Sequence, residues 1–300
     1  MAIKILVTGR DGQVGHELMR SLAPLGKVVG VDVKECDLTQ SAMINALLDK
    51  VKPDVIVNPA AYTAVDKAES EPTIAHAVNA QAPKVLALYA SKRNIPIVHF
   101  STDYVYDGKK DGLYVEDDPV GPKSVYGKTK YLGEEAVRKN AAKVVILRTS
   151  WVFGAHGVNF LKTMLKLAQE RDKLSIVADQ VGAPTSARML ADVTAEIVRQ
   201  LLDQGAYRKY GTYHLVAEGE TSWHGYAQYV IEQASALGLK TKIVAKDVKA
   251  IGTKDYPMPA PRPANSRLDI TKIKETFGIT LPTWQEEVDL VLRELIEVKP

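Results

Sequence analysis

The chain has 300 residues, of which 46% are hydrophobic and 25% are charged. These values are ordinary for a globular protein of one large domain or two smaller ones. The net charge is only +3 and no run of five or six basic residues occurs, so the sequence shows no nucleic-acid-binding pattern.

Signals for export, membrane insertion and metal binding are missing from the sequence, which predicts a cytoplasmic protein. The apolar segment at 3–7 is too short for a signal peptide, and no stretch approaches the ~20 apolar residues of a membrane span. Cys36 is the single cysteine, which excludes a disulfide within the chain and fits a reducing compartment. The nearest pair of histidines, His214 and His224, is too far apart for a zinc motif on one helical face, so no metal site is predicted.

In the first half of the chain, short apolar runs alternate with segments of helical spacing. The runs are rich in Val and Ile and continuous, as in strands buried on both faces of a parallel sheet. They are 3–7, 28–33, 54–58, 96–101 and 143–150. Between the first two, Val14, Leu18 and Leu22 recur at helical spacing. The order strand, helix, strand, helix predicts an α/β, Rossmann-like, doubly wound parallel sheet.

After about residue 153 the alternation loosens. The later segments of helical or strand character are 158–171, 174–179, 187–202, 211–216 and 222–237. The proline-rich segment 255–269 should lack regular structure over much of its length. We therefore expect a dinucleotide-binding domain at 1–153. Residues 154–300 should form mainly a smaller substrate-binding region, interleaved with the last strands of the sheet.

A glycine loop follows the first predicted strand. Gly9, Gly12 and Gly15 have the spacing GxxGxxG, a variant of the dinucleotide fingerprint in which glycines let the backbone approach a pyrophosphate at a helix amino terminus. Asp32, at the end of the second predicted strand, is suited to the hydroxyls of the adenosine ribose. Asp32 favours NADH, whereas Arg10 and Lys34 are suited to the 2′-phosphate of NADPH, so both cofactors remain open.

The stretch "SVYGKTK" (124–130) allows more than one interpretation. A phosphate-binding Walker A loop needs four residues between its glycines and a preceding buried strand. Gly121 and Gly127 enclose five residues, and the segment before them is polar. The phosphate-loop interpretation therefore fails.

Tyr126 and Lys130 lie at i and i+4 on a predicted helix, so both project from one face. Tyr106 and Lys110 share this spacing, but the adjacent Asp-Gly turn disfavours a helix there. An ammonium ~4 Å from a phenol at an effective dielectric of ~20 favours the phenolate by at most ~4 kcal/mol. That is enough to bring the pKa of the tyrosine from ~10 towards ~7, the range suited to general acid catalysis on a carbonyl.

Several longer segments carry a family resemblance that runs almost end to end. They are "GRDGQVGHEL", "AVDKAESEP", "STDYVYDG", "VYGKTK", "LRTSWVFG", "DQVGAPTSARMLAD", "GTYHLVAEGETSWHGYA" and "RPANSRLD". With them the chain resembles the extended short-chain dehydrogenase/reductases, the NAD-dependent epimerase/dehydratase-like family. The glycine loop and Tyr-x-x-x-Lys are shared across that superfamily, whereas "AVDKAESEP", "DQVGAPT" and "RPANSRLD" are specific.

The resemblance implies a catalytic triad of Thr102, Tyr126 and Lys130. Tyr126 would protonate the oxygen at C4 of a sugar while NADPH or NADH delivers hydride to that carbon. Thr102 would hydrogen-bond the carbonyl, and Lys130 would tune Tyr126 and hold the nicotinamide ribose.

The resemblance also implies two sets of binding residues. On the cofactor side these are Gly12, Gln13 and Val14 in the loop, Asp37 and Leu38 near adenine, and Ala61, Tyr62 and Thr63 after the third strand. On the substrate side they are Thr102, Asp103 and Tyr104, Trp151 in the sugar pocket, and Arg262 and Arg267 for the pyrophosphate.

The implied reaction is reduction of the C4 ketone of dTDP-6-deoxy-L-lyxo-4-hexulose to dTDP-L-rhamnose. Related dehydratases carry an acidic residue where this chain has Tyr104, so reduction is favoured over elimination of water. Alternatives are a reductase or epimerase of another nucleotide sugar, and a noncatalytic nucleotide-binding regulatory subunit. A homodimer is compatible with the resemblance, but Arg188 stands where some relatives have an acidic metal ligand, which argues against a metal-bridged dimer.

Overall fold

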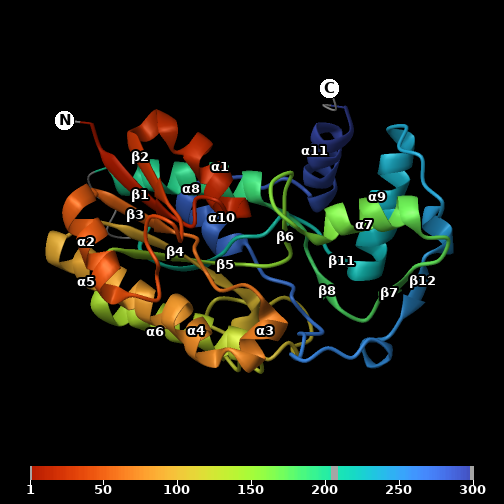
Figure 1. Cartoon of the computed structure of the whole chain (residues 1–300), viewed down its shortest axis with the longest axis horizontal. Coiled ribbons are helices and arrows are strands. Elements are labelled where there is room, and N and C mark those ends of the chain that lie inside the picture. Colours follow the sequence, from red (N-terminus) through yellow and green to blue (C-terminus); the bar gives the residue numbers. More distant parts are fainter. Residues whose placement is uncertain (1, 204–208, 298–300) are drawn as a thin grey trace.

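A parallel sheet built from both halves of the chain forms the larger part of the molecule (Figure 1). The computed structural model describes residues 2–203 and 209–297. Within these residues the sheet has six strands in the order β10-β5-β4-β3-β1-β2, and every pair of neighbours is parallel. The reversal of direction at β1, with later strands added on one side and β2 on the other, is typical of a doubly wound fold. The predicted Rossmann-like sheet is confirmed.

The strands of the main sheet are β1 (Lys4–Thr8), β2 (Lys27–Val31), β3 (Val55–Asn58), β4 (Ile97–Thr102), β5 (Val144–Thr149) and β10 (Gly211–His214). The short strands pair in twos and are β6 (Val152–Phe153), β7 (Ser175–Val177), β8 (Val181–Gly182), β9 (Thr185–Ser186), β11 (Thr221–Ser222) and β12 (Lys249–Ile251). The helices are α1 (Gln13–Ser21), α2 (Ser41–Val51), α3 (Val65–Ser70), α4 (Pro72–His76), α5 (Ala82–Arg93), α6 (Val125–Asn140), α7 (Phe160–Glu170), α8 (Ala187–Leu201), α9 (Trp223–Ala236), α10 (Thr271–Phe277) and α11 (Trp284–Glu297). A π-helical turn spans Ala77–Gln81, and short 3-10 turns span Ala23–Leu25, Asp103–Val105, Ala245–Asp247 and Thr253–Asp255.

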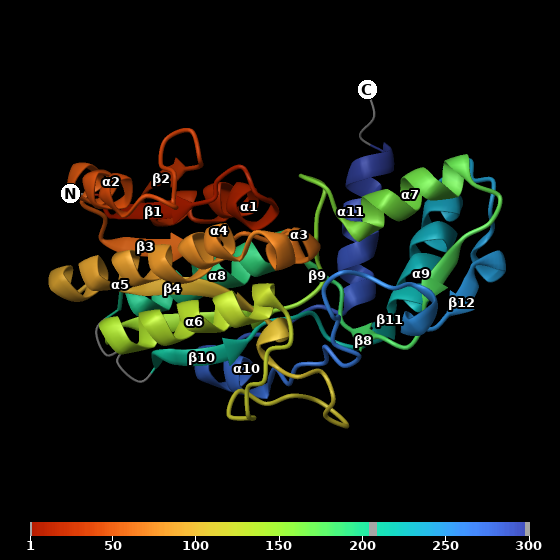
Figure 2. The ribbon, with the colours of Figure 1, turned by 60° about the horizontal axis from the view of Figure 1, so that its bottom comes forward.

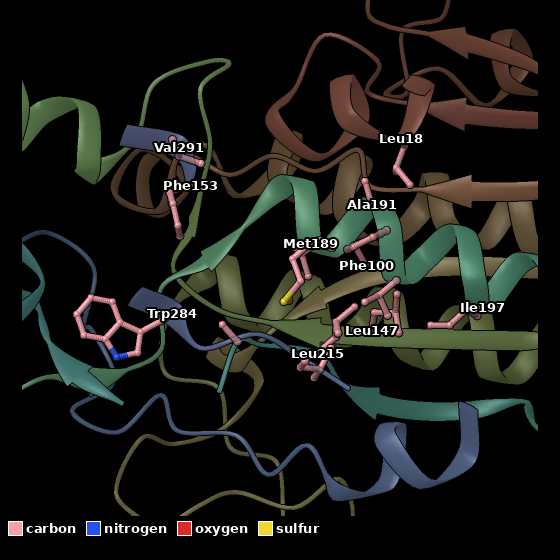
Figure 3. Close-up of a cluster of buried hydrophobic side chains, with 14 of the residues drawn as sticks. Leu18, Phe100, Leu147, Phe153, Met189, Ala191, Ile197, Leu215, Trp284 and Val291 are labelled. Carbon is pink, nitrogen blue, oxygen red and sulfur yellow. The ribbon is translucent and has the colours of Figure 1, made fainter. Parts of the chain in front are cut away.

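Helices cover both faces of the sheet because the strands are apolar on both faces. Leu6 and Ile56 face a cluster completed by α2, α5 and α6, while Val7 and Val57 face one that includes α1 and α8. Figure 2 shows α5 and α6 in front of the sheet and α8 behind it. In Figure 3, side chains of α8 gather against Phe100 and Leu147 of the sheet. Fully burying one such side chain stabilises the fold by roughly 1.5–3 kcal/mol.

A smaller part, made of α7, α9, β7 and β12, lies at one end of the molecule in both Figures 1 and 2. The strand-like segment 174–179 contributes only Ser175–Val177, which pairs with β12 and not with the main sheet. From the second half of the chain, β10 joins the main sheet, beside β5. No helix among the described residues is both long and apolar enough to cross a bilayer.

The starts of two helices differ in how they are capped. The Ser124 side chain caps α6 by accepting a hydrogen bond from the Gly127 amide. Gln40 holds the cap position of α2 without a side-chain bond. The Thr39 hydroxyl donates to Asp37, 2.8 Å away.

Candidate active site

One cavity of about 940 Å³ lies where β1 to β5 end. The carboxyl ends of parallel strands meet at one edge of a sheet, so segments distant in the sequence converge there. Most of the predicted site residues line this cavity. They are Gly9, Gly12, Gln13, Val14, Gly15, Asp32, Asp37, Leu38, Ala61, Tyr62, Thr63, Thr102, Asp103, Tyr104, Tyr126, Lys130 and Trp151.

The glycine loop forms one wall of the cavity, and it has no room for a side chain at Gly9 or Gly15. Gly9 has φ +65°, a conformation that favours glycine. A Cβ on Gly15 would lie 1.8 Å from the Gly9 carbonyl oxygen, so the turn and the helix pack backbone against backbone. Helix α1 starts after Gly12 without a side-chain cap. Its first amide groups thus face the cavity as donors for an anion such as a pyrophosphate.

Beyond the glycine loop, Asp32 is held by the backbone. Its Oδ2 accepts from the Asp11 amide at 2.9 Å, and its Oδ1 accepts from the Val33 amide at 2.8 Å. Arg10, the candidate for a 2′-phosphate, already pairs with Asp11 at 3.0 Å and with Glu35 at 3.2 Å. Asp32 therefore lines the cavity at the end of β2, whereas Arg10 is already paired and does not line it.

Tyr62, after β3, is fixed at both its backbone and its hydroxyl. Its amide donates to Asn79 at 2.8 Å, and its hydroxyl donates to Glu71 at 2.5 Å. The neighbouring Ala61 and Thr63 line the cavity with it. The loop after β3 therefore forms part of the cavity wall beside the glycine loop, where a Cβ on Gly9 would lie 3.0 Å from Ala60.

The three expected catalytic residues come together from β4 and α6. Thr102 is the last residue of β4, and its side chain lies close enough to the Tyr126 hydroxyl to oppose the rise that burial causes in the pKa of that phenol. Lys130, one helical turn after Tyr126, is buried and donates to the Phe100 carbonyl at 2.6 Å. The Tyr104 ring meets the Tyr126 ring edge-on at a centroid distance of 5.4 Å. The i, i+4 spacing thus delivers both groups to one cavity.

The electrostatics of this trio differ from the expectation. Burial raises the pKa of Tyr126 to about 12, and its hydrogen bond with Thr102 only partly opposes that effect. Burial also lowers the pKa of Lys130 to about 8, against the favourable charge of Glu134. The pKa of Tyr126 is therefore not brought towards ~7 in this structure, because desolvation is the largest effect on the phenol and the charge of Asp103 acts in the same direction.

Asp103, expected at the sugar, is nearly enclosed in the protein. Its Oδ1 accepts from Thr102 at 3.0 Å, and its Oδ2 accepts from Ser266 at 2.5 Å. Burial raises its pKa to about 6 despite these bonds. Asp103 therefore lines the cavity and also holds the Thr102 hydroxyl by a hydrogen bond.

The two candidate arginines lie outside the main cavity. Arg262 lines a small adjoining cleft of about 30 Å³ with Tyr104, and it pairs with Asp66 at 2.6 Å. Arg267 lines neither space; it bonds Asn265 at 2.9 Å and approaches Glu220 at 3.5 Å. The proline-rich loop thus places Arg262 next to the site and ties Arg267 to its own segment.

Sequence reasoning missed a buried polar network beneath the triad. Glu134, one turn after Lys130 on α6, accepts from Ser101 at 2.5 Å and from Arg148 at 2.7 and 2.9 Å. Arg148 in turn donates to the Tyr106 hydroxyl at 2.6 Å. The one sequence signal was an acidic residue at i+4 from Lys130 on the predicted buried face. Tyr106, which has the same spacing to Lys110 as Tyr126 has to Lys130, is therefore part of this buried network and not of the triad.

The family model described as RmlD substrate binding domain matches residues 3–297. The chain belongs to this family. A dTDP-4-dehydrorhamnose reductase of Burkholderia thailandensis is 46% identical over 98% of this chain and 99% of its own length. The Escherichia coli K12 enzyme of the same name is 44% identical over 98% of each chain.

Solved structures of this family superpose closely on the chain. A dTDP-4-dehydrorhamnose reductase of Clostridium acetobutylicum has a TM-score of 0.89 and 36% identity, covering 98% of this chain and 99% of that one. A Bacillus anthracis dTDP-4-dehydrorhamnose reductase in complex with NADP has a TM-score of 0.88 and 30% identity, covering 98% and 100%. The full-length coverage means that the cavity and the smaller part both have counterparts in these structures.

The cavity fits a nicotinamide dinucleotide on its own geometry. It joins an uncapped helix amino terminus, a carboxylate at the end of β2, and a Tyr and Lys pair beyond β4. No group of three or more His, Cys, Asp or Glu side chains that suits a metal ion occurs within 2–203 and 209–297. Arg188, at the start of α8, lies close enough to Glu287 to oppose the rise that burial causes in the pKa of that carboxyl.

Proposed function

We propose that this chain reduces the C4 ketone of dTDP-6-deoxy-L-lyxo-4-hexulose with NAD(P)H to give dTDP-L-rhamnose. The observation that carries the proposal is the meeting of Thr102, Tyr126 and Lys130 in the cavity that the glycine loop borders. Full-length relatives named dTDP-4-dehydrorhamnose reductase, 41–46% identical, support the same reaction.

Binding would be divided along the cavity. The α1 amino terminus and the glycine loop would hold the pyrophosphate, Asp32 the adenosine ribose, and Asp37 and Leu38 the adenine, while the loop at 61–63 would contact the cofactor after β3. NAD(P)H supplies hydride when bound. We also propose that 1–153 provide most of the cofactor site and that 154–300 mainly enclose the substrate.

Tyr126 would act as the acid. With a pKa of about 12 it keeps its proton at neutral pH, yet it is a stronger acid than the alcohol that forms at C4. Thr102, whose hydroxyl donates to Asp103 in this structure, would turn that proton to the same oxygen and stabilise its developing charge. The buried Lys130 ammonium lowers the cost of the phenolate that remains after proton transfer. Tyr104, packed on the Tyr126 ring, supplies no carboxylate for removal of water.

The sugar would lie against Thr102, Asp103, Tyr104 and Trp151. Arg262, in the adjoining cleft, is the candidate for the diphosphate of the nucleotide sugar. The position of Arg267 does not support the same role. We further propose a cytoplasmic enzyme, consistent with its single, buried Cys36, and a homodimer that light scattering would detect.

The proposal is tested by the oxidation of NADPH or NADH with dTDP-linked and UDP-linked 4-ketosugars. We expect turnover with the dTDP-linked sugar, and Tyr126→Phe should lower kcat by at least about 100-fold, the usual worth of a general acid. Its affinity for NADPH, measured by calorimetry, should be retained. Tyr131→Phe on the same helix is the matched control. A folded wild-type protein that oxidises neither cofactor with the dTDP-linked ketosugar would refute the proposal.

A further inference from the structure

Trp151 has an unusual backbone conformation at the edge of the cavity. Its φ is +50°, in the left-handed region that residues with a side chain seldom adopt. Such a conformation costs free energy and persists where its surroundings determine it. The neighbours of this indole are therefore part of what shapes the site.

Two residues, Trp223 of α9 and Gly182 of β8, pack against the indole. The Trp223 ring stacks on it with a centroid distance of 3.7 Å and an interplanar angle of 15°. A Cβ on Gly182 would lie only 2.9 Å from Cε2 of Trp151. Trp223 is backed in turn by Phe160, 4.7 Å away between ring centroids. Trp151 is thus held in a slot that has no room for a larger residue at position 182.

The walls of this slot are fixed to each other. Gly182 in β8 pairs with Thr221 in β11, and β11 leads directly into α9, whose first residue is Trp223. Ser222 caps that helix by accepting from the Gly225 amide at 3.0 Å. The Trp151 carbonyl accepts from the Thr185 amide at 3.2 Å. Strand pairing, a helix cap and a backbone hydrogen bond therefore connect the segments that surround the indole.

The same scaffold reaches the other wall of the site. The Ser266 amide donates to the Val181 carbonyl at 2.7 Å, and the Ser266 hydroxyl donates to Asp103. A Cβ on Gly182 would also lie 3.1 Å from Cβ of Ser266. The strand β8 therefore separates Trp151 from the residues that support Thr102, and it sets the width between them.

We propose that Trp223 is a positioning residue, which fixes the Trp151 indole as the apolar wall of the subsite for the deoxyhexose. Gly182 is the spacer that lets the indole lie close to the strand. An apolar indole suits the C–H groups and the methyl group of a 6-deoxy sugar, and its placement governs sugar binding and not cofactor binding. This inference rests on the proposed function and adds a specificity-determining pair to it.

Trp223→Phe tests the proposal, with two independent measurements. Stacked indoles give an exciton couplet in far-ultraviolet circular dichroism, which we expect in the wild type and not in the variant. In NADPH oxidation we expect KM for the dTDP-linked ketosugar to rise about tenfold, with KM for NADPH within twofold. Gly182→Ala should raise the sugar KM likewise and serves as the second variant if Trp223→Phe does not fold.

Trp284→Phe is the matched control, because it removes the third tryptophan of the chain from a site outside the cavity. It should keep the couplet and the sugar KM. The proposal is overturned if Trp223→Phe loses the couplet and leaves the sugar KM unchanged, or if it raises both KM values equally. A wild type that shows the couplet but does not turn over the ketosugar would refute the proposed function instead.

Discussion

At the scale of single residues, burial and not charge pairing sets the acid and base properties of the site. Tyr126, Lys130 and Asp103 all have pKa values displaced towards their neutral forms. For Tyr126 this direction suits a proton donor, which must be protonated before reaction. The sequence could place a phenol and an ammonium on one helical face, but it could not give the desolvation that a closed cavity imposes.

In the wild type, ionisation of Asp103 should lower the free energy of unfolding as the pH rises, and Asp103→Asn should remove this loss. The carboxyl has a folded pKa of about 6 against an ordinary 3.8, so the folded state binds its proton more tightly than the unfolded state. Its contribution is therefore fully present below pH ~4 and is lost as the pH rises through 6, a change of about 3 kcal/mol. Asparagine keeps a carbonyl acceptor without the charge.

This prediction is checked by urea unfolding of both proteins between pH 4 and 8. The wild type should lose stability relative to Asp103→Asn up to about pH 6 and then run parallel to it. The exposed Asp117→Asn is the control. Parallel curves for wild type and Asp103→Asn across the whole range would contradict a raised pKa.

At the scale of elements, the predicted strands and helices of the first half were correct to within a few residues. Val- and Ile-rich runs can only be buried strands here, and Ser124 marks the start of α6. The short paired strands were beyond sequence analysis: β8 and β11 have two residues each, and their pairing depends on distant segments. The slot around Trp151 is built from such pieces, which is why Trp223 and Gly182 were not predicted.

The buried pair of Arg148 and Glu134 should dominate the attachment of α6 to β5. Both side chains are almost inaccessible to solvent, and each has further partners. Arg148→Met leaves Glu134 with less compensation for its buried charge and removes a donor to Tyr106. We expect the free energy of unfolding to fall by about 3 kcal/mol.

Urea denaturation measures this loss. The double variant Arg148→Met with Glu134→Met should recover most of it, since neither charge then remains buried. Glu196→Gln breaks a solvent-exposed pair with Arg199 on α8 and should change stability by less than about 1 kcal/mol. If the double variant is no more stable than Arg148→Met alone, the loss of stability comes from the packing of these side chains and not from an uncompensated buried charge.

At the scale of the whole molecule, the two halves of the sequence share one core. Side chains of β1, α1 and β5 belong to the same cluster as those of α8, β10 and α10. The sequence pattern indicated that the second half of the chain is interleaved with the last strands of the sheet. It could not show that the helix at 187–201 covers the sheet beside α1. That contact joins residues about 170 positions apart, and it is seen in the Ser21 hydroxyl bond to the Ala191 carbonyl.

A fragment of residues 1–153 should therefore fail to fold on its own, although it contains every part of the expected cofactor site. Without α8 the fragment would expose Leu18 of α1 and, on one face of its sheet, Val7 and Phe100, each at a cost of roughly 1.5–3 kcal/mol. It would also leave β5 as an unpaired edge, since β10 is its neighbour.

For this fragment we expect aggregation, no cooperative thermal unfolding and no binding of NADPH by calorimetry. Co-expression with 154–300 should restore solubility, cooperative unfolding and NADPH binding, because the missing strand and helix are then supplied by the second fragment. A monomeric 1–153 that binds NADPH and melts cooperatively would instead show that the cofactor half is an autonomous domain.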